Sequence, residues 1–127
     1  MGVRGIRGAI TVDANNEEQI LRATAELLNR IVERNAIRPE DIACVLVTVT
    51  EDLDSTFPAR AIRQMPGWEL VPLMCALEVP VKGSLERCIR LMVLVNTSLS
   101  QAEICHVYLG EAQKLRPDLS DRQTGIS

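Results

Sequence analysis

The feature that most constrains this sequence is an apolar run at residues 86–96, ERCIRLMVLVN. Seven of its eleven residues are apolar, and the run is too short to cross a membrane, so it predicts a strand buried on both faces. Alternation places Arg90 on one face with Met92 and Leu94. A guanidinium keeps its proton, so Arg90 requires a carboxylate partner, an anionic ligand or a path to solvent. The strand alone leaves these alternatives open.

A second arginine stands in a second predicted strand, at residues 2–12. Alternation puts Arg7 on a face made of small side chains, and glycines in a strand permit the close approach of another body. Arg7 therefore either faces water at a sheet edge or has open space beside it for an anion. Residues 42–50 predict another strand that is buried on both faces.

Helix signals are clearest near Asn16, which can act as an N-cap, with Gln19 completing a capping box. An apolar stripe follows and predicts a long helix that ends near Arg34-Asn35. Residues 57–65 predict a short helix with Pro58 at its first position. Pro72 within the segment and Pro80 after it confine residues 68–79 to an edge or irregular strand. A last short strand is predicted at residues 104–109.

This order of elements predicts a single mixed α/β domain over residues 1–127, with a β-sheet covered by one long helix and one short helix. Residues 116–127 are expected to form a mobile C-terminal tail. One long helix cannot cover both faces of the sheet, so the second face is expected to meet another copy of the chain. We therefore expect a homo-oligomer with a large apolar interface.

Composition argues against several function classes. The net charge is −3 and there are only three aromatic residues, which does not favour nucleic-acid binding. The four cysteines are widely spaced and His106 is the only histidine, so a zinc site is not expected. We expect free thiols in a reducing cytosol, since neither a signal sequence nor a membrane span is visible. His106 itself is predicted to face solvent without a role.

The chemical inventory is rich in arginine, the side chain suited to forked recognition of carboxylates. The sequence holds no GxSxG motif, no glycine loop for phosphates and no evident nucleophile–base pair. It therefore indicates a site that binds anions and donates hydrogen bonds, with little means for proton transfer or covalent catalysis.

The chain resembles the small monofunctional chorismate mutases of the trimeric pseudo-α/β-barrel type. The matching segments occur in order along nearly the whole chain: VRGIRGA, FPARAIR, GWELVPLMCALEV, RCIRLMVLV, HVYL and LRPDL. The resemblance implies an α+β fold, with a mixed β-sheet, in a trimer whose core resembles an α/β barrel. It also implies a cytoplasmic isomerase that converts chorismate to prephenate by a pericyclic rearrangement, on the route to phenylalanine and tyrosine. It implies active sites at the subunit interfaces, with no metal or organic cofactor and no membrane or nucleic-acid partner.

The resemblance also assigns roles by position. Arg90 would contact a substrate carboxylate and the ether oxygen, Arg7 would hold the enolpyruvyl carboxylate, and Glu78 and Cys75 would hold the ring hydroxyl. Tyr108 would donate a hydrogen bond to a carboxylate or contact the ring. The remaining positions would line the pocket, help to close it or add positive charge at its mouth: Phe57, Ala59, Arg60, Arg63, Leu73, Met74, Leu115 and Arg116. Arg60 and Met74 depart from the residues expected in relatives, which leaves the pocket edge uncertain.

Three alternatives stay open at this stage. Glu78 could pair with Arg90 whether or not it meets substrate. Cys75 and Glu78 are three residues apart and point to opposite faces of a regular strand. Both can touch one ligand if the chain bends between them or if they come from different subunits, and we expect the second. The chain could instead be a trimeric enamine/imine deaminase, which the segment Pro58-Ala59-Arg60 faintly suggests, or a non-catalytic relative of such deaminases that binds small carboxylates. It could also be a structural subunit without a ligand.

Overall fold

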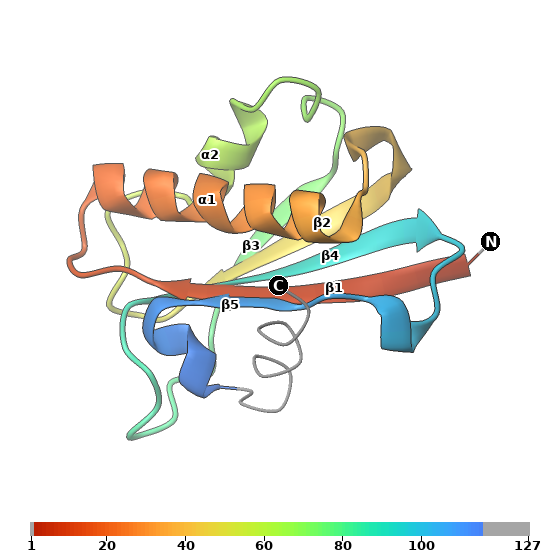
Figure 1. The fold of residues 1–127 in the computed structure, drawn as a ribbon. Helices are drawn as coiled ribbons and strands as arrows, with labels where there is room; N and C mark the ends of the chain where they lie inside the picture. Colours follow the sequence, from red (N-terminus) through yellow and green to blue (C-terminus); the bar gives the residue numbers. More distant parts are fainter. Residues whose placement is uncertain (1, 116–127) are drawn as a thin grey trace.

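The computed structural model describes residues 2–115, so Arg116 and the predicted tail at 116–127 lie outside the described residues. Five strands form one sheet in the order β3-β2-β4-β1-β5, and both α-helices lie on the same face of it (Figure 1). The strands are β1 (Gly2–Thr11), β2 (Ile42–Val49), β3 (Leu73–Leu77), β4 (Cys88–Thr97) and β5 (Val107–Leu109). The helices are α1 (Glu17–Asn35) and α2 (Ala59–Arg63).

The sheet is mixed, as the sequence predicts. β4 pairs antiparallel with β1 and β2, while the edge strands β5 and β3 pair parallel with β1 and β2. Three 3-10 helices, η1 (Pro39–Asp41), η2 (Gln101–Glu103) and η3 (Gly110–Lys114), complete the described chain.

Two edge strands are shorter than predicted. Residues 68–72 form turns ahead of β3, and Trp68 is buried in the core with 3% of its surface exposed. Pro72 directly precedes Leu73, where the ladder with β2 begins at Val45. The last strand begins at Val107 and not at Ile104, because the segment before it is held by side chains and not by strand pairing.

Helix α1 begins as predicted at Asn16, whose side chain accepts a hydrogen bond from the Gln19 N–H at 2.8 Å. The return half of the capping box is wrong: Gln19 Oε1 accepts from the N–H groups of Asp13 and Ala14, both at 3.1 Å. This side chain therefore ties the end of the β1–α1 connection to the first turn. The helix ends at Ala36, which adopts a left-handed conformation with φ 50°.

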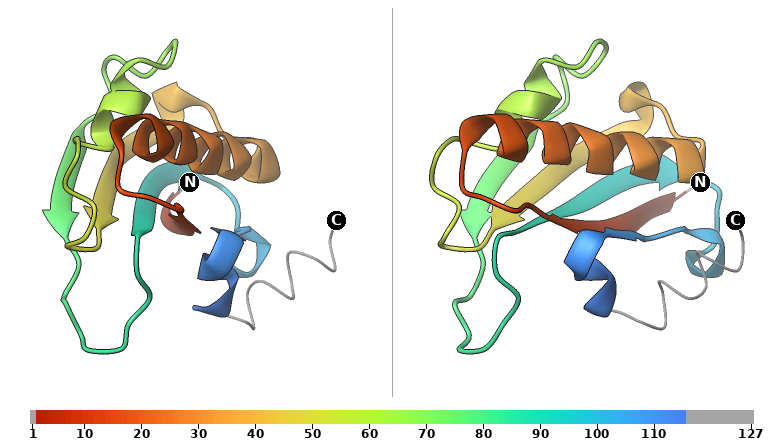
Figure 2. Two further views of the ribbon diagram at one scale, coloured as in Figure 1. Left: turned by 90° about the vertical axis from the view of Figure 1, so that its left-hand side faces the viewer. Right: turned by 60° about the vertical axis from the view of Figure 1, so that its left-hand side comes forward.

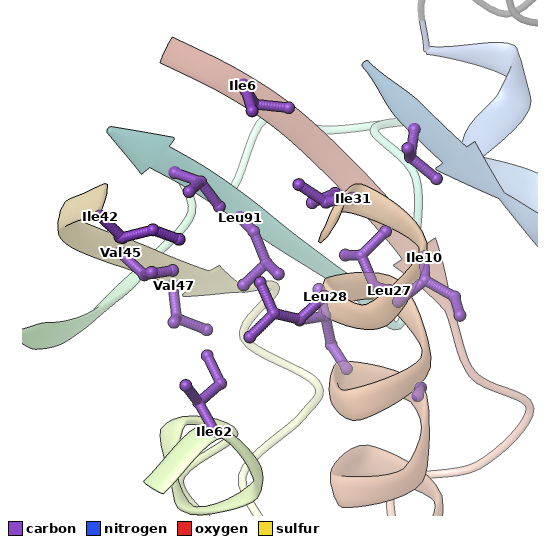
Figure 3. Close-up of a cluster of buried hydrophobic side chains, with 14 of the residues drawn as sticks. Ile6, Ile10, Leu27, Leu28, Ile31, Ile42, Val45, Val47, Ile62 and Leu91 are labelled. Atoms are coloured by element: carbon purple, nitrogen blue, oxygen red, sulfur yellow. The ribbon is translucent and has the colours of Figure 1, made fainter. Parts of the chain in front are cut away.

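The core lies between the sheet and the two helices. Figure 3 shows Leu27, Leu28 and Ile31 of α1 facing apolar side chains of β1, β2 and β4, while Ile62 extends the cluster from α2. These four residues are fully buried. Burial of this apolar stripe supplies the main driving force for docking the helix on the sheet.

The prediction of strands buried on both faces is wrong for the single chain. Along β2, Val45 and Val47 are completely buried, whereas Leu46 between them is 40% exposed. Along β4 the same alternation leaves Met92 and Leu94 only partly buried. The reason is that neither α1 nor α2 reaches this second face, which Figure 2 shows on the side away from α1. We call the sheet surface formed by Val3, Leu46, Met74, Met92 and Leu94 the open face.

Gly8 is the point of closest approach between β1 and α1. A Cβ built there would lie 2.7 Å from Ile31 Cδ1 and 3.1 Å from Leu27 Cδ1. We expect Gly8→Ala to lower the free energy of unfolding by roughly 1–3 kcal/mol, the usual range for overpacking a core. Urea unfolding followed by Trp68 fluorescence measures it, with Gly2→Ala as control because nothing lies within 4 Å of that Cβ. Equal midpoints for the two variants would contradict the expected clash.

Among residues 2–115, no helix has both the length and the apolar character needed to cross a membrane.

Candidate active site

The candidate site is built on one row of residues that crosses the sheet from edge to edge. The register places Arg90 of β4 directly between Ala9 of β1 and Thr48 of β2. The row continues to Tyr108 on β5 and to Ala76 on β3. Directly paired residues share a face of the sheet, so all five side chains lie on the open face.

Arg7 joins this row from two residues away on β1. It pairs with Met92, which makes Arg7 and Arg90 diagonal neighbours on adjacent strands, with Cβ atoms about 7 Å apart by the usual sheet spacing. The small side chain of Ala9 separates them and leaves room above the sheet. Both arginines line one hollow of about 390 Å³, a size within the roughly 300–1,000 Å³ of small-molecule pockets.

This hollow, the Arg90 hollow, gathers five of the predicted site residues, namely Arg7, Glu78, Arg90, Tyr108 and Leu115. The rest of its lining comes from Gly8, Ala9, Leu46, Thr48, Leu91 and Met92. Two guanidinium groups and one carboxylate therefore share a cavity with mostly apolar walls, and positive charge is in excess there. Such a lining suits a ligand with more than one carboxylate.

Glu78 pairs with Arg90 in the hollow. Arg90 Nε lies 3.6 Å from Glu78 Oε1, and the two side chains are 45% and 24% exposed. The Thr48 hydroxyl donates to the other Glu78 oxygen, and the Glu78 N–H donates to the Val49 carbonyl at 2.9 Å. The carboxylate is thus held from β2 while its partner comes from β4. Arg90 therefore has a carboxylate partner, and its half-exposed side chain also lines the hollow.

A small second cluster of buried residues adjoins the hollow, because some of its members also line the cavity. Tyr108, Cys88, Ala9 and Ala112 pack together, with Leu85 and Leu115 against them. Burial raises the pKa of the Cys88 thiol to about 11, and the nearby Arg90 guanidinium only partly opposes this shift. Cys88 therefore stays protonated near neutral pH and acts as a packing group beside Arg90, not as a nucleophile. All four cysteines are free thiols.

The other predicted residues lie away from the Arg90 hollow. Phe57, which is 69% exposed, and Cys75 line a different hollow of about 440 Å³ between β3 and the loop before α2. We call this the Phe57 hollow. Cys75 and Glu78 thus line different hollows of the same chain, as their spacing predicts.

The remaining residues belong to α2 and β3 and line neither hollow. Ala59 is buried and Arg63 is exposed on α2. Arg60 is held by Glu17, 2.5 Å away, and by Thr56 Oγ1 at 2.7 Å. Leu73 packs against the core, whereas Met74 is 67% exposed and pairs with Leu46 on the open face. The structure therefore separates the predicted set into two groups.

Two residues that touch this arrangement were not predicted as part of it. Thr48 holds Glu78, and no motif marks it, because its position opposite Arg90 depends on strand register. His106 is half-buried, and its Nδ1 accepts a hydrogen bond from the Arg7 N–H at 2.9 Å. The prediction that His106 is a solvent-facing strand residue is therefore wrong, since it precedes β5 and long-range pairing brings it to β1.

The described residues contain no group of three or more His, Cys, Asp or Glu side chains arranged to hold a metal ion.

Comparison with known proteins gives one consistent result. The family model described as chorismate mutase type I matches residues 3–119. The chain is 48% identical to chorismate mutase AroH of Bacillus subtilis (strain 168) over 120 residues, which cover 94% of each protein. It is 55% identical to chorismate mutase AroH of Thermus thermophilus over 122 residues, or 95% of this chain and 99% of that protein.

A solved structure agrees with these sequence matches. The chorismate mutase from Clostridium thermocellum superposes with a TM-score of 0.85 at 46% sequence identity. The match covers 87% of this chain and 98% of that one.

Proposed function

The chain belongs to the type I chorismate mutase family and is a chorismate mutase, and we propose that chorismate rearranges to prephenate in the Arg90 hollow. The observation that supports this choice is that Arg7 and Arg90, from different strands, line the same hollow. Chorismate carries two carboxylates, and two forked cations over a small apolar cavity match that charge pattern.

The chemistry fits what the hollow offers. The rearrangement is unimolecular and requires no acid, base or nucleophile, so the protein must hold the substrate in its folded, reactive conformer. The ether oxygen gains negative charge as its C–O bond breaks. A fixed cationic donor beside that oxygen stabilises the transition state more than the substrate and so raises kcat.

We assign Arg90 to the ether oxygen and one carboxylate. Its pairing with Glu78 fixes the guanidinium before substrate arrives, which limits the reorganisation needed during reaction. Arg7 holds the enolpyruvyl carboxylate, and Tyr108 donates a hydrogen bond to a carboxylate or contacts the ring. Glu78 accepts from the ring hydroxyl, and Leu115 narrows the opening of the hollow.

The second group of predicted residues requires a second subunit in this proposal. Phe57 and Cys75 line a hollow separate from that of Arg90 in one chain, so one chain alone does not surround the substrate. A neighbouring subunit that covers the open face brings its own Phe57 hollow to the Arg90 hollow. Phe57 then forms a wall and Cys75 meets the ring hydroxyl, while the surrounding residues complete the edge: Ala59, Arg60, Arg63, Leu73 and Met74.

The open face supports this assembly by its composition. Val3 and Met74 are 56% and 67% exposed, and an apolar sheet surface of this kind is typical of an interface. We propose a homotrimer with an active site at each interface, which is the assembly implied by the resemblance, and a cytoplasmic location for the enzyme.

The test is the loss of chorismate absorbance on adding protein, with prephenate identified as product. We expect kcat to be nearly flat between about pH 6 and 8, because neither arginine nor ordinary carboxylates titrate in that range. A bell-shaped kcat profile within this range would indicate acid–base catalysis and contradict the proposed chemistry. An enamine substrate serves as control, since a deaminase would consume it and a mutase would not.

A further inference from the structure

His106 makes a contact that the proposed chemistry does not use. Its Nδ1 accepts the Arg7 N–H at 2.9 Å across 99 residues of sequence. A backbone N–H can only donate, so this ring nitrogen carries no proton and the imidazole proton lies on Nε2. The ring thereby adds one side-chain hydrogen bond at the end of the β1–β5 ladder, whose first pair is Gly8 with Val107.

The segment that carries His106 is anchored on its other side by α1. The buried Asn35 side chain accepts the Cys105 N–H at 2.8 Å and donates to the Cys105 carbonyl at 2.9 Å. The same amide also donates to the Ile31 carbonyl at 2.9 Å. Cys105 is therefore fixed to the helix, and the next residue reaches β1, so the imidazole has a defined position.

The two partners of this contact, Arg7 and His106, are both close in sequence to the Arg90 hollow. Arg7 itself lines the hollow, and Tyr108, two residues after His106, lines it as well. The Arg7 side chain is long and exposed, so the location of its guanidinium depends on how firmly its backbone is held.

We propose that His106 is a positioning residue for substrate binding, which acts by holding the Arg7 backbone through Nδ1. This inference rests on the proposed function of the Arg90 hollow. Arg7 binds a carboxylate that is present in both substrate and transition state. Loss of its anchor therefore raises KM and leaves kcat nearly unchanged.

Three substitutions in the full-length chain test the geometry of the acceptor. In asparagine, Oδ1 is separated from Cβ by the same number of bonds as Nδ1 in histidine. In glutamine, Oε1 is one bond further from Cβ, at the same separation as Nε2 in histidine. We expect His106→Ala and His106→Gln to raise KM for chorismate about five-fold, the effect of one ordinary hydrogen bond, with kcat within about two-fold of the starting enzyme. His106→Asn should restore KM. A KM for His106→Asn as high as for His106→Gln, or no change in any variant, overturns the proposal.

A second measurement does not depend on activity. In protein labelled with ¹⁵N-arginine, the Arg7 amide resonance should move in His106→Ala and His106→Gln and return toward its original position in His106→Asn. An Arg7 amide that is unaffected by all three substitutions overturns the inference, even if chorismate turnover confirms the proposed function. Conversely, inactive wild-type protein with the expected amide shifts would refute only the proposed function.

A double-mutant cycle separates positioning from general stability. In an Arg7→Ala background, His106→Ala should have no further effect on KM, because the group that it positions is absent. An undiminished effect in that background would contradict the role.

Discussion

Arg90→Lys is expected to keep the fold and lose most of kcat. Removing one donor to a developing oxyanion typically reduces kcat by roughly 10²–10³-fold, and we expect a loss of at least about 10²-fold here. The lysine retains the positive charge, but the three N–H groups of its ammonium diverge tetrahedrally and cannot present the parallel, coplanar donors of the guanidinium fork. Stopped chorismate assays at saturating substrate measure the loss directly.

The position of Arg90 makes a stability artefact easy to identify. Its side chain is 45% exposed on the open face, so the substitution should leave the urea unfolding midpoint almost unchanged. Arg34→Lys, on the exposed surface of α1, is the matched control and should have wild-type kcat. A kcat for Arg90→Lys close to wild type would refute the role assigned to Arg90.

Leu94→Asp is expected to have the second large effect, through assembly. Leu94 lies on the open face of β4, where its Cδ2 would be 3.6 Å from a Cβ at Gly5. A carboxylate there would be desolvated without a partner if a second subunit covers this face, which costs several kcal/mol. We expect the proposed trimer to dissociate, and kcat/KM to fall by at least about 10²-fold because each proposed interfacial site would lose its second half.

Sedimentation analysis together with the chorismate assay checks this expectation. Leu70→Asp introduces the same charge at a leucine that is 95% exposed and lines neither hollow, so it should remain a fully active trimer. Monomeric Leu94→Asp protein with normal kcat/KM would disprove an interfacial site, although it would leave the reaction itself intact.

Local sequence patterns predicted the elements well. The 3.6-residue stripe after Asn16 and the apolar run around Arg90 correspond to α1 and β4, because burial of one face dictates such periods. The predicted boundaries of the strands were less accurate where the sequence offers few local signals. The strand predicted at residues 68–79 is only Leu73–Leu77, since its length depends on how far β2 can pair with it.

The sequence by itself determined which residue types are available for chemistry: arginines in strands, among them Arg7 and Arg90, almost no aromatic residues and no evident nucleophile–base pair. It also determined that Cys75 and Glu78 point to opposite faces, since that depends only on strand alternation. Only the tertiary structure decided that Tyr108, Ala9, Arg90 and Thr48 form one row and that His106 reaches Arg7. Register between distant strands is set by packing of the whole sheet against α1, and no local pattern encodes it.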